Sequence, residues 1–360
     1  MSEHGGELAP GMDVGGYLIE SKIGEGGMGL VYGAMHPQIR KRVAIKVLGQ
    51  TYCRDPGVVE RFEQEARLVN EIHHSNIIDV FGFGQLADGR KYLIMEWLDG
   101  ESLTSRIDRG AIPAAEALEI LDAICDAMLA VHEKGIVHRD LKSDNIFLVS
   151  RRGQQHVKLL DFGLAKLAGS NNPKAITKTR TGIVVGTPAY LSPEQARGKQ
   201  ADHRTDVYQL GVLAHKMLTG RLPFVGDTPV DYIVQHLQKP PPSPGLLVPS
   251  IPDALSGIVV RMMAKTPEER PTLADIRGVL AEVRAGRSPA LGPLPPSAAG
   301  ATGTGSQAAL AIAGSQAALP IPAPAESAPA AKPASQKALL VVALVLLAII
   351  IGGVVILAAR

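Results

Sequence analysis

The chain has 360 residues, and its 37 lysines and arginines nearly balance its 35 aspartates and glutamates, for a formal net charge of +2. This balance excludes a surface dominated by polyanion binding, so we expect no nucleic-acid partner. Cys53 and Cys125 are the only cysteines. This excludes a disulfide framework and a zinc finger, and it favours a reducing compartment.

Strand-like patterns precede helical ones along the chain. The first 16 residues contain neither a basic region nor an apolar run, so they are not a secretory signal, and we expect them to be flexible. Strand-like runs follow at residues 17–20, 30–32, 43–48 and 91–97, and a helical pattern lies at residues 58–71. Beyond Pro113, helical patterns dominate at residues 114–134, 206–219 and 253–264. This order predicts two lobes of one catalytic unit, of the α+β class.

The composition changes after residue 287. Residues 288–337 are mostly Ala, Pro, Gly and Ser, which cannot bury enough apolar surface to fold, so we expect a disordered linker. Residues 338–359 are 22 positions without a charged or polar side chain. As one helix they would span about 33 Å, enough to cross a bilayer, whereas a buried core helix would need a domain around it. Lys332 and Lys337 before this span predict a single-pass protein of the cell membrane with a cytoplasmic N-terminal side.

Three glycines near the N-terminus, Gly24, Gly26 and Gly29, have the spacing G-x-G-x-x-G. A dinucleotide-binding turn would need a helix directly after them. Here a strand-like run follows, which favours a β-hairpin. Glycines at the tip of a hairpin let backbone N–H groups approach phosphate oxygens closely.

A lysine interrupts the apolar run at residues 43–48. Burying an unpaired ammonium group is unfavourable, so Lys46 needs either a partner or an edge strand on which it points to water. In the first case it would contact phosphate and pair with a carboxylate. Glu65, on the helix that follows, could supply that carboxylate.

Two further motifs complete a recognisable series. Residues 138–145 read HRDLKSDN, and residues 161–163 read DFG after two short strand-like runs. With the glycine loop, the sequence VAIK at residues 43–46 and SPE at residues 192–194, the chain resembles the eukaryotic-type protein kinases. GGMG at residues 26–29 and Ser192 are typical of the bacterial, Hanks-type serine/threonine kinases.

The resemblance implies a two-lobed protein kinase fold over residues 17–287, with a β-rich N-lobe to about residue 98 and a helical C-lobe from about residue 99. The linker at 288–337 and one transmembrane helix at 338–359 would lie outside it. The implied cofactors are ATP and Mg²⁺, for which Mn²⁺ can substitute. The implied partners are protein substrates with Ser or Thr and, through residues 338–359, the lipid bilayer. Pairing of two copies through their small lobes is known among relatives, and the residues leave it open.

By the same resemblance, Lys46, Asp140 and Lys142 are the catalytic residues. Asp140 would orient the attacking hydroxyl, and Lys142 would neutralise charge on the transferred group. Asn145 and Asp161 would ligate the metal. Met95 would guard the pocket behind the adenine, which the backbone of residues 96–98 would contact. The full implied nucleotide-binding set is Ile23, Gly24, Gly26, Gly29, Val31, Ala44, Lys46, Glu65, Glu96, Leu98, Asn145 and Asp161.

Substrate class and regulation also follow from the resemblance. Lys142 and the tripeptide Gly-Thr-Pro at residues 186–188 are similar to the corresponding residues of the serine/threonine branch. Thr179 and Thr181 match an autophosphorylated pair, and Arg139 would pair with phosphate on their loop. Scaffold roles fall to the pair Glu194 and Arg270 and to Asp206.

The alternative to a kinase is a pseudokinase-like scaffold that recruits partners to the membrane, which Lys46, Glu65, Asp140, Asn145 and Asp161 argue against. A small-molecule phosphotransferase would lack the segment at residues 186–194 that shapes a peptide-binding site.

Overall fold

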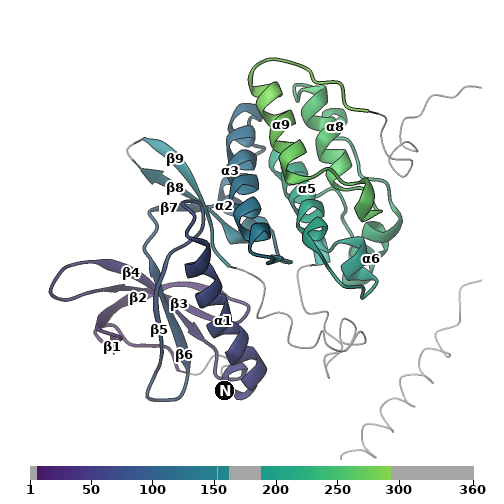
Figure 1. Ribbon diagram of the computed structural model, residues 1–360. Helices are drawn as coiled ribbons and strands as arrows, with labels where there is room; N and C mark the ends of the chain where they lie inside the picture. Colours follow the sequence, from purple (N-terminus) through teal and green to yellow (C-terminus); the bar gives the residue numbers. More distant parts are fainter. Residues whose placement is uncertain (1–5, 152, 162–187, 293–360) are drawn as a thin grey trace, which may run out of the picture. The chain divides into compact units, whose positions relative to one another are not determined.

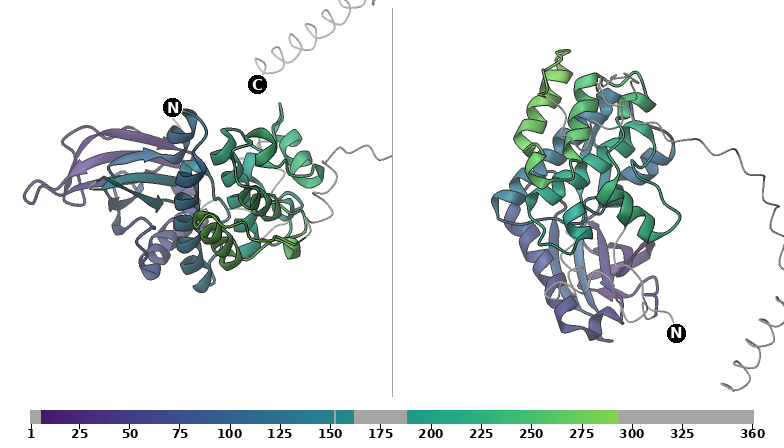
Figure 2. Two further views of the ribbon diagram at one scale, coloured as in Figure 1. Left: turned by 90° about the horizontal axis from the view of Figure 1, so that it is seen from above. Right: turned by 90° about the vertical axis from the view of Figure 1, so that its right-hand side faces the viewer.

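The computed structural model describes residues 6–151, 153–161 and 188–292 (Figure 1). The small lobe is an antiparallel sheet of six strands with one helix, and the large lobe is mainly helical. Figure 2 shows the same division from two other directions, with the six-stranded sheet in the purple to blue part of the chain and helices in the green part. The predicted order of a strand-rich part followed by a helix-rich part is confirmed.

The sheet of the small lobe has the order β1-β2-β3-β4-β6-β5. Its strands are β1 (Asp13–Val14), β2 (Tyr17–Gly26), β3 (Gly29–Met35), β4 (Arg42–Leu48), β5 (Val80–Gln85) and β6 (Lys91–Glu96). Because side chains alternate along a strand, β4 contributes to two cores. Val43, Ile45 and Val47 lie in one, and Ala44 and Leu48 lie in the other.

Helix α1 (Pro56–Ile72) covers the face of the sheet that carries Ala44. Asp55 caps its first turn by accepting a hydrogen bond from the backbone N–H of Gly57 at 2.9 Å, and Pro56 occupies the first helical position, where no N–H is needed. Phe62, Ala66 and Val69 recur at helical spacing and are buried in the shared core. The helix therefore fixes Glu65, which lies on the same turns and is buried.

The large lobe is built around α5 (His203–Thr219), of which almost every residue from Thr205 onward is buried. The other helices are α2 (Leu103–Asp108), α3 (Ala114–Glu133), α4 (Pro193–Ala196), α6 (Pro229–Gln238), α7 (Pro244–Leu247), α8 (Asp253–Met262) and α9 (Leu273–Arg284). Helices α5 and α8 approach closely at Gly211, where a Cβ atom would lie 2.8 Å from side-chain atoms of Met262 and Met263. Only glycine allows this contact.

The remaining elements are a small sheet of three short strands and several 3₁₀ turns. A second sheet has the order β7-β8-β9, formed by β7 (Gly100–Ser102), β8 (Ile146–Arg151) and β9 (Gln154–Leu159). The 3₁₀ turns are η1 (Tyr52–Arg54), η2 (Ser143–Asn145), η4 (Pro188–Tyr190) and η5 (Pro267–Glu269). Strands β8 and β9 are the pair predicted before the DFG motif.

The structure differs from the sequence expectation at both ends of the domain. Leu8 and Val14 are buried in the small-lobe core, and β1 pairs with β2, so the described part of the N-terminus is ordered. At the other end, Leu291 packs against the large-lobe core, beyond the predicted limit of residue 287.

Several predictions fall on residues outside those described. They are the linker beyond residue 292, the span at 338–359, and Thr179 and Thr181. No helix among the described residues combines the length and the apolar composition needed to cross a bilayer.

A buried ion pair joins α4 to the segment before α9. The guanidinium of Arg270 donates two hydrogen bonds of 2.8 Å to the two carboxylate oxygens of Glu194, and Thr205 donates a third, of 2.6 Å. Burial tends to raise the pKa of Glu194, but the bonds from Arg270 and Thr205 outweigh it, so this pKa lies below its ordinary value. The pairing of Glu194 with Arg270 expected from the sequence is present.

We expect the substitution Arg270→Met to destabilise the domain by about 3–5 kcal/mol, because it leaves the Glu194 carboxylate buried without its cation. The measurement is urea unfolding near pH 7. The loss should shrink as the pH falls, because Glu194 contributes stability above its unfolded pKa that disappears when the folded carboxyl is protonated.

The matched control is Arg287→Met, which removes an exposed arginine paired with Glu282. Its unfolding midpoint should stay at the wild-type value, since exposed ion pairs contribute little. Equal losses in the two variants would contradict a special role for the buried pair.

Candidate active site

A cavity of about 260 Å³ opens between the glycine hairpin, the centre of β4, the segment after β6 and the end of β9. All of the predicted nucleotide-binding residues line it except Glu65 and Asn145. Four lining residues were not predicted for this role: Glu25, Ile78, Phe147 and Leu160. The signal for Phe147 and Leu160 was their place in the strand-like runs beside residue 145 and residue 161. One end of the cavity is apolar and the other carries charge.

Lys46 marks the charged end. Strand β4 is paired with β3 on one side and β6 on the other, so Lys46 is not on an edge strand and that alternative is wrong. Its Nζ atom lies 2.9 Å from Oδ2 of Asp161. Burial acts to lower the pKa of Lys46, but the charges of Asp161, Glu65 and Asp140 outweigh it and raise this pKa above its ordinary value. The ammonium group is therefore charged at physiological pH.

Glycine is present for different physical reasons at the three positions of the hairpin between β2 and β3. A Cβ atom at Gly29 would lie 2.0 Å from the carbonyl oxygen of Val47, so packing alone requires glycine there. At Gly24 and Gly26 the nearest atoms to such a Cβ would be 3.8 and 3.9 Å away. The fold does not require glycine at these two positions, which both border the cavity. Close approach of a ligand to the backbone explains them better.

Glu96, the last residue of β6, begins the hinge, the segment that joins the two lobes. Its side chain is bonded within the protein, so only its backbone is available to a ligand. The Glu96 carboxylate accepts a hydrogen bond of 2.9 Å from the N–H of Asp79 and pairs with Lys158 of β9. Lys158 also donates to the carbonyl oxygen of Ile77, at 3.0 Å. These contacts fix the hinge to the large lobe, and no sequence motif announced them.

The loop at residues 138–145 holds three predicted residues together. The amide nitrogen of Asn145 donates to the carbonyl oxygen of Asp140 at 2.8 Å and to its Oδ2 atom at 3.1 Å. Nζ of Lys142 lies 3.6 Å from the same Oδ2 atom. With its nitrogen turned to Asp140, Asn145 presents its side-chain oxygen elsewhere, which suits a hard cation such as Mg²⁺.

Asp206 of α5 positions this loop. Its buried carboxylate accepts hydrogen bonds from the N–H of His138 at 2.9 Å, from the N–H of Arg139 at 2.7 Å and from His132 at 2.8 Å. Arg139 has a φ of 64°, an unfavourable conformation for a residue with a Cβ atom. The role of Asp206 expected from the resemblance is therefore matched by its contacts.

Two glutamines were missed by sequence reasoning. The side-chain oxygen of Gln209 accepts from the N–H of Leu141 at 2.9 Å, and its nitrogen donates to the carbonyl oxygen of Arg139 at 2.9 Å. Gln195 donates to the same carbonyl at 3.1 Å. The backbone on both sides of Asp140 is thus held from α4 and α5.

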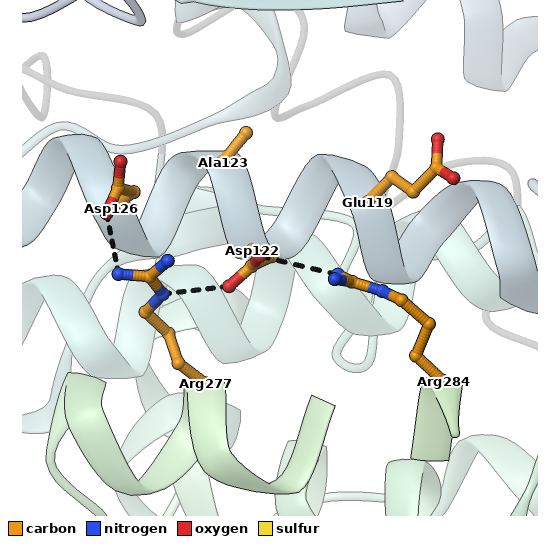
Figure 3. A pocket seen from close by; sticks show the side chains of 6 residues that line it. All are labelled: Glu119, Asp122, Ala123, Asp126, Arg277 and Arg284. Carbon is orange, nitrogen blue, oxygen red and sulfur yellow. Dashed lines mark hydrogen bonds and ion pairs between the residues drawn. The ribbon is translucent and has the colours of Figure 1, made fainter. Parts of the chain in front are cut away.

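A second cavity, of about 250 Å³, lies between α3 and α9 (Figure 3). Arg277 donates to Asp122 at 2.8 Å and to Asp126 at 2.6 Å, and Arg284 lies 3.4 Å from Asp122. These ion pairs between the two arginines and the two aspartates hold α9 against α3. We therefore assign it a structural role, and we place the active site in the cavity at Lys46.

Comparison with known proteins follows the same line. The profile of the family described as "Protein kinase domain" matches residues 17–279. The chain is 45% identical over 261 residues to "Serine/threonine-protein kinase Pkn1" of Myxococcus xanthus, covering 72% of this chain and 37% of the relative. It is 36% identical over 278 residues to "Serine/threonine-protein kinase PknB" of Mycobacterium leprae, covering 76% and 44%. The chain thus spans less than half the length of these relatives.

Among solved structures, the crystal structure of the Mycobacterium tuberculosis PknI kinase domain is similar, with a TM-score of 0.60 and 28% identity. The match covers 77% of this chain and 99% of that one. This likeness confirms the expected two-lobed fold.

We expect Asp206→Asn to speed hydrogen exchange of the backbone amides at residues 138–141 by about tenfold or more. The asparagine side chain has an NH₂ group in place of one carboxylate oxygen, and this group cannot accept a hydrogen bond from a backbone N–H. Mass spectrometry of the exchanged protein measures this.

Asp202→Asn is the control, since Asp202 caps the same helix by accepting from the N–H of Arg204 and is not bonded to this loop. It should affect exchange only in the first turn of α5. Unchanged exchange at residues 138–141 in Asp206→Asn would show that the loop is held by other contacts.

Proposed function

The chain belongs to the protein kinase domain family, and from this membership we propose that it is a serine/threonine protein kinase that transfers the γ-phosphoryl group of ATP to hydroxyl groups of proteins. The observation that carries the proposal is that Asp161, which lines the cavity, and Asp140, which lies outside its lining, both act on the charge of Lys46. They come from three distant segments of the chain. Phosphoryl transfer requires mainly positioning and neutralisation of charge, which such a cluster supplies.

The nucleotide fits the division of the cavity. Its adenine would occupy the apolar end, near Ala44 and Leu98, and its triphosphate would extend toward Lys46 below the glycine hairpin. Asp161 and Asn145 would hold Mg²⁺, since both offer oxygen ligands. The metal, when bound, neutralises charge on the phosphate oxygens.

Asp140 and Lys142 would act on the substrate hydroxyl and on the transferred group. Asp140 would accept the hydrogen bond of the hydroxyl, orient it and take its proton. Lys142, beside Asp140, would neutralise charge that builds on the phosphoryl oxygens. The names of the similar kinases, and Lys142 itself, support serine and threonine as the acceptors.

Regulation by autophosphorylation is part of the proposal. Arg139 follows the buried His138, and within the described residues its Nε atom is buried without a hydrogen-bond partner. A phosphate on Thr179 or Thr181 would supply that partner through a charge-assisted bond. We also propose that residues 338–359 tether the kinase domain to the cytoplasmic side of the cell membrane.

The test of activity compares the wild-type chain with Lys46→Met and Asp140→Asn, using labelled ATP, Mg²⁺ and a general protein substrate. Each variant should lose about 10²–10³-fold in rate, because each removes a group that stabilises or positions the transferring phosphoryl. Nucleotide binding should separate them. Lys46 lines the cavity and Asp140 does not, so only Lys46→Met should weaken binding of a fluorescent ATP analogue.

A wild-type chain that labels substrate no better than both variants, while still binding the analogue, would favour the scaffold over the kinase.

Membrane attachment is tested by flotation of the whole chain with phospholipid vesicles. The double variant Leu346→Lys, Ile350→Lys should lose its association, since each charge at the centre of a span costs about 2.5–3.5 kcal/mol. Two lysines placed in the linker instead, at Ala328 and Ala331, should leave flotation unchanged. Flotation of the first variant at the wild-type level would argue against a span.

A further inference from the structure

We propose that His236 of α6 is a positioning residue for the protein substrate, because it holds the carbonyl of Ala189 and so fixes the Pro188–Tyr190 turn beside the catalytic loop. Nε2 of His236 lies 3.1 Å from the carbonyl oxygen of Ala189. The proposal deepens the proposed kinase function and rests on it, since it assigns this turn to the binding of the polypeptide that carries the hydroxyl.

A chain of hydrogen bonds reaches this carbonyl from the core of the large lobe. Nζ of Lys265 lies 3.3 Å from Oη of Tyr208, and Oη lies 2.9 Å from Nδ1 of His236. Lys265 also donates to the carbonyl oxygen of His236, at 2.8 Å. Lys265, Tyr208 and His236 thus form one connected group that ends at Ala189.

The direction of every bond in this chain follows from its last acceptor. A carbonyl oxygen only accepts, so Nε2 of His236 must carry the proton. Burial, with the nearby charge of Lys265, lowers the pKa of His236 to about 3, so the ring is neutral and Nδ1 must accept from Tyr208. Tyr208 then accepts from Lys265. Loss of the imidazole would leave both the Tyr208 hydroxyl and the Ala189 carbonyl without this partner.

His236 is also the contact that seats α6 in the lobe. It is the one side chain of α6 that is fully buried, whereas Val230 and Val234 of the same helix are exposed. Its ring packs at 4.9 Å from that of Phe224. Tyr232 packs against the core beside it, but His236 is the side chain of α6 that is bonded to the turn, so its hydrogen bonds set the position of the turn relative to this helix.

The residue after Ala189 is held from the opposite direction by the catalytic loop. Ser143 accepts from Thr104 at 2.7 Å and from Lys216 at 3.1 Å, which leaves its own proton for Oη of Tyr190, 3.1 Å away. The turn therefore lies between α6 and η2.

This turn borders the place where a substrate hydroxyl must arrive. Ser143 lies three residues after Asp140, and Gln195, a few residues beyond the turn, donates to the carbonyl of Arg139, immediately before Asp140. Because these contacts tie the segment from Ala189 to Gln195 to the loop that carries Asp140, we assign this segment to the binding of the polypeptide. Ala189 is not among the residues that line the nucleotide cavity, so a shift of the turn should affect protein binding and spare ATP.

The experiment measures KM for a protein substrate and KM for ATP in His236→Leu, with His236→Gln as the conservative variant. His236→Leu should raise the protein KM about tenfold, the size expected for loss of one buried hydrogen-bonding partner, and leave the ATP KM within about twofold of wild type. His236→Gln keeps an amide donor within reach of Ala189 and should recover most of the loss.

The matched control is His215→Leu. His215 is also a buried histidine of the large lobe, but its ring is bonded to the carbonyl oxygen of Arg221 and to Thr219 instead of the turn. It should lower stability without changing the protein KM. A protein KM that stays at the wild-type value in His236→Leu, or rises equally in His215→Leu, would overturn the proposal, as would a parallel rise in the ATP KM.

Hydrogen exchange at residues 189–192 gives a readout that needs no activity. Exchange there should rise in His236→Leu and stay at the wild-type level in His215→Leu. Unchanged exchange in His236→Leu overturns the positioning role even if the wild-type chain is an active kinase. A wild-type chain that transfers no phosphate overturns the proposed function instead, and with it the assignment of the turn to a protein substrate.

Discussion

The contact between the Asp206 carboxylate and the backbone of the catalytic loop is the interaction on which the site depends. An ionised carboxylate that is 1% exposed is stable only if its oxygens are hydrogen-bonded, and two of its donors are the N–H groups of His138 and Arg139. Arg139 in turn holds a left-handed φ that costs about 1–3 kcal/mol by itself. The hydrogen bonds to Asp206 offset the strain at Arg139, and the same N–H groups satisfy the buried carboxylate. The position of Asp140, the next residue, depends on both.

Helix α5 extends this support to the other parts of the site. Thr205 donates to Glu194, Tyr208 donates to His236, and Gln209 is bonded to the backbone of Arg139 and Leu141. These side chains are neighbours on one helix, yet they face the segment at η4 and α4, helix α6 and the catalytic loop. Because a packed helix moves as a unit, the segments that flank Asp140 are held in fixed positions relative to one another by α5.

The sequence predicted what lies within single segments and missed what depends on distant ones. Short motifs identified Lys46, Asp140 and Asp161, and the structure brings them together, although their chemical roles stay predictions. Gln195 and Gln209 carried no signal, because a neutral amide has no characteristic spacing and its partners lie many residues away. The strand β5 (Val80–Gln85) was missed for a different reason, because two glycines interrupt its apolar pattern. Leu8 was expected to be flexible, but its N–H is bonded to the buried Tyr32 hydroxyl at 3.1 Å, a contact that an isolated apolar residue does not announce.

The arrangement of charge around the cavity explains how the protein tolerates such a site. Lys46 lies beside Asp161, and Lys142 lies beside Asp140, so each cation has a carboxylate within 4 Å. In a complex with nucleotide and metal, a phosphate group would replace Asp161 as the anionic partner of Lys46. The metal would replace Lys46 as the cationic partner of Asp161. Each immediate neighbour would then be replaced by a group of the same charge, so the balance of charge around Lys46 and Asp161 would be preserved when the nucleotide binds.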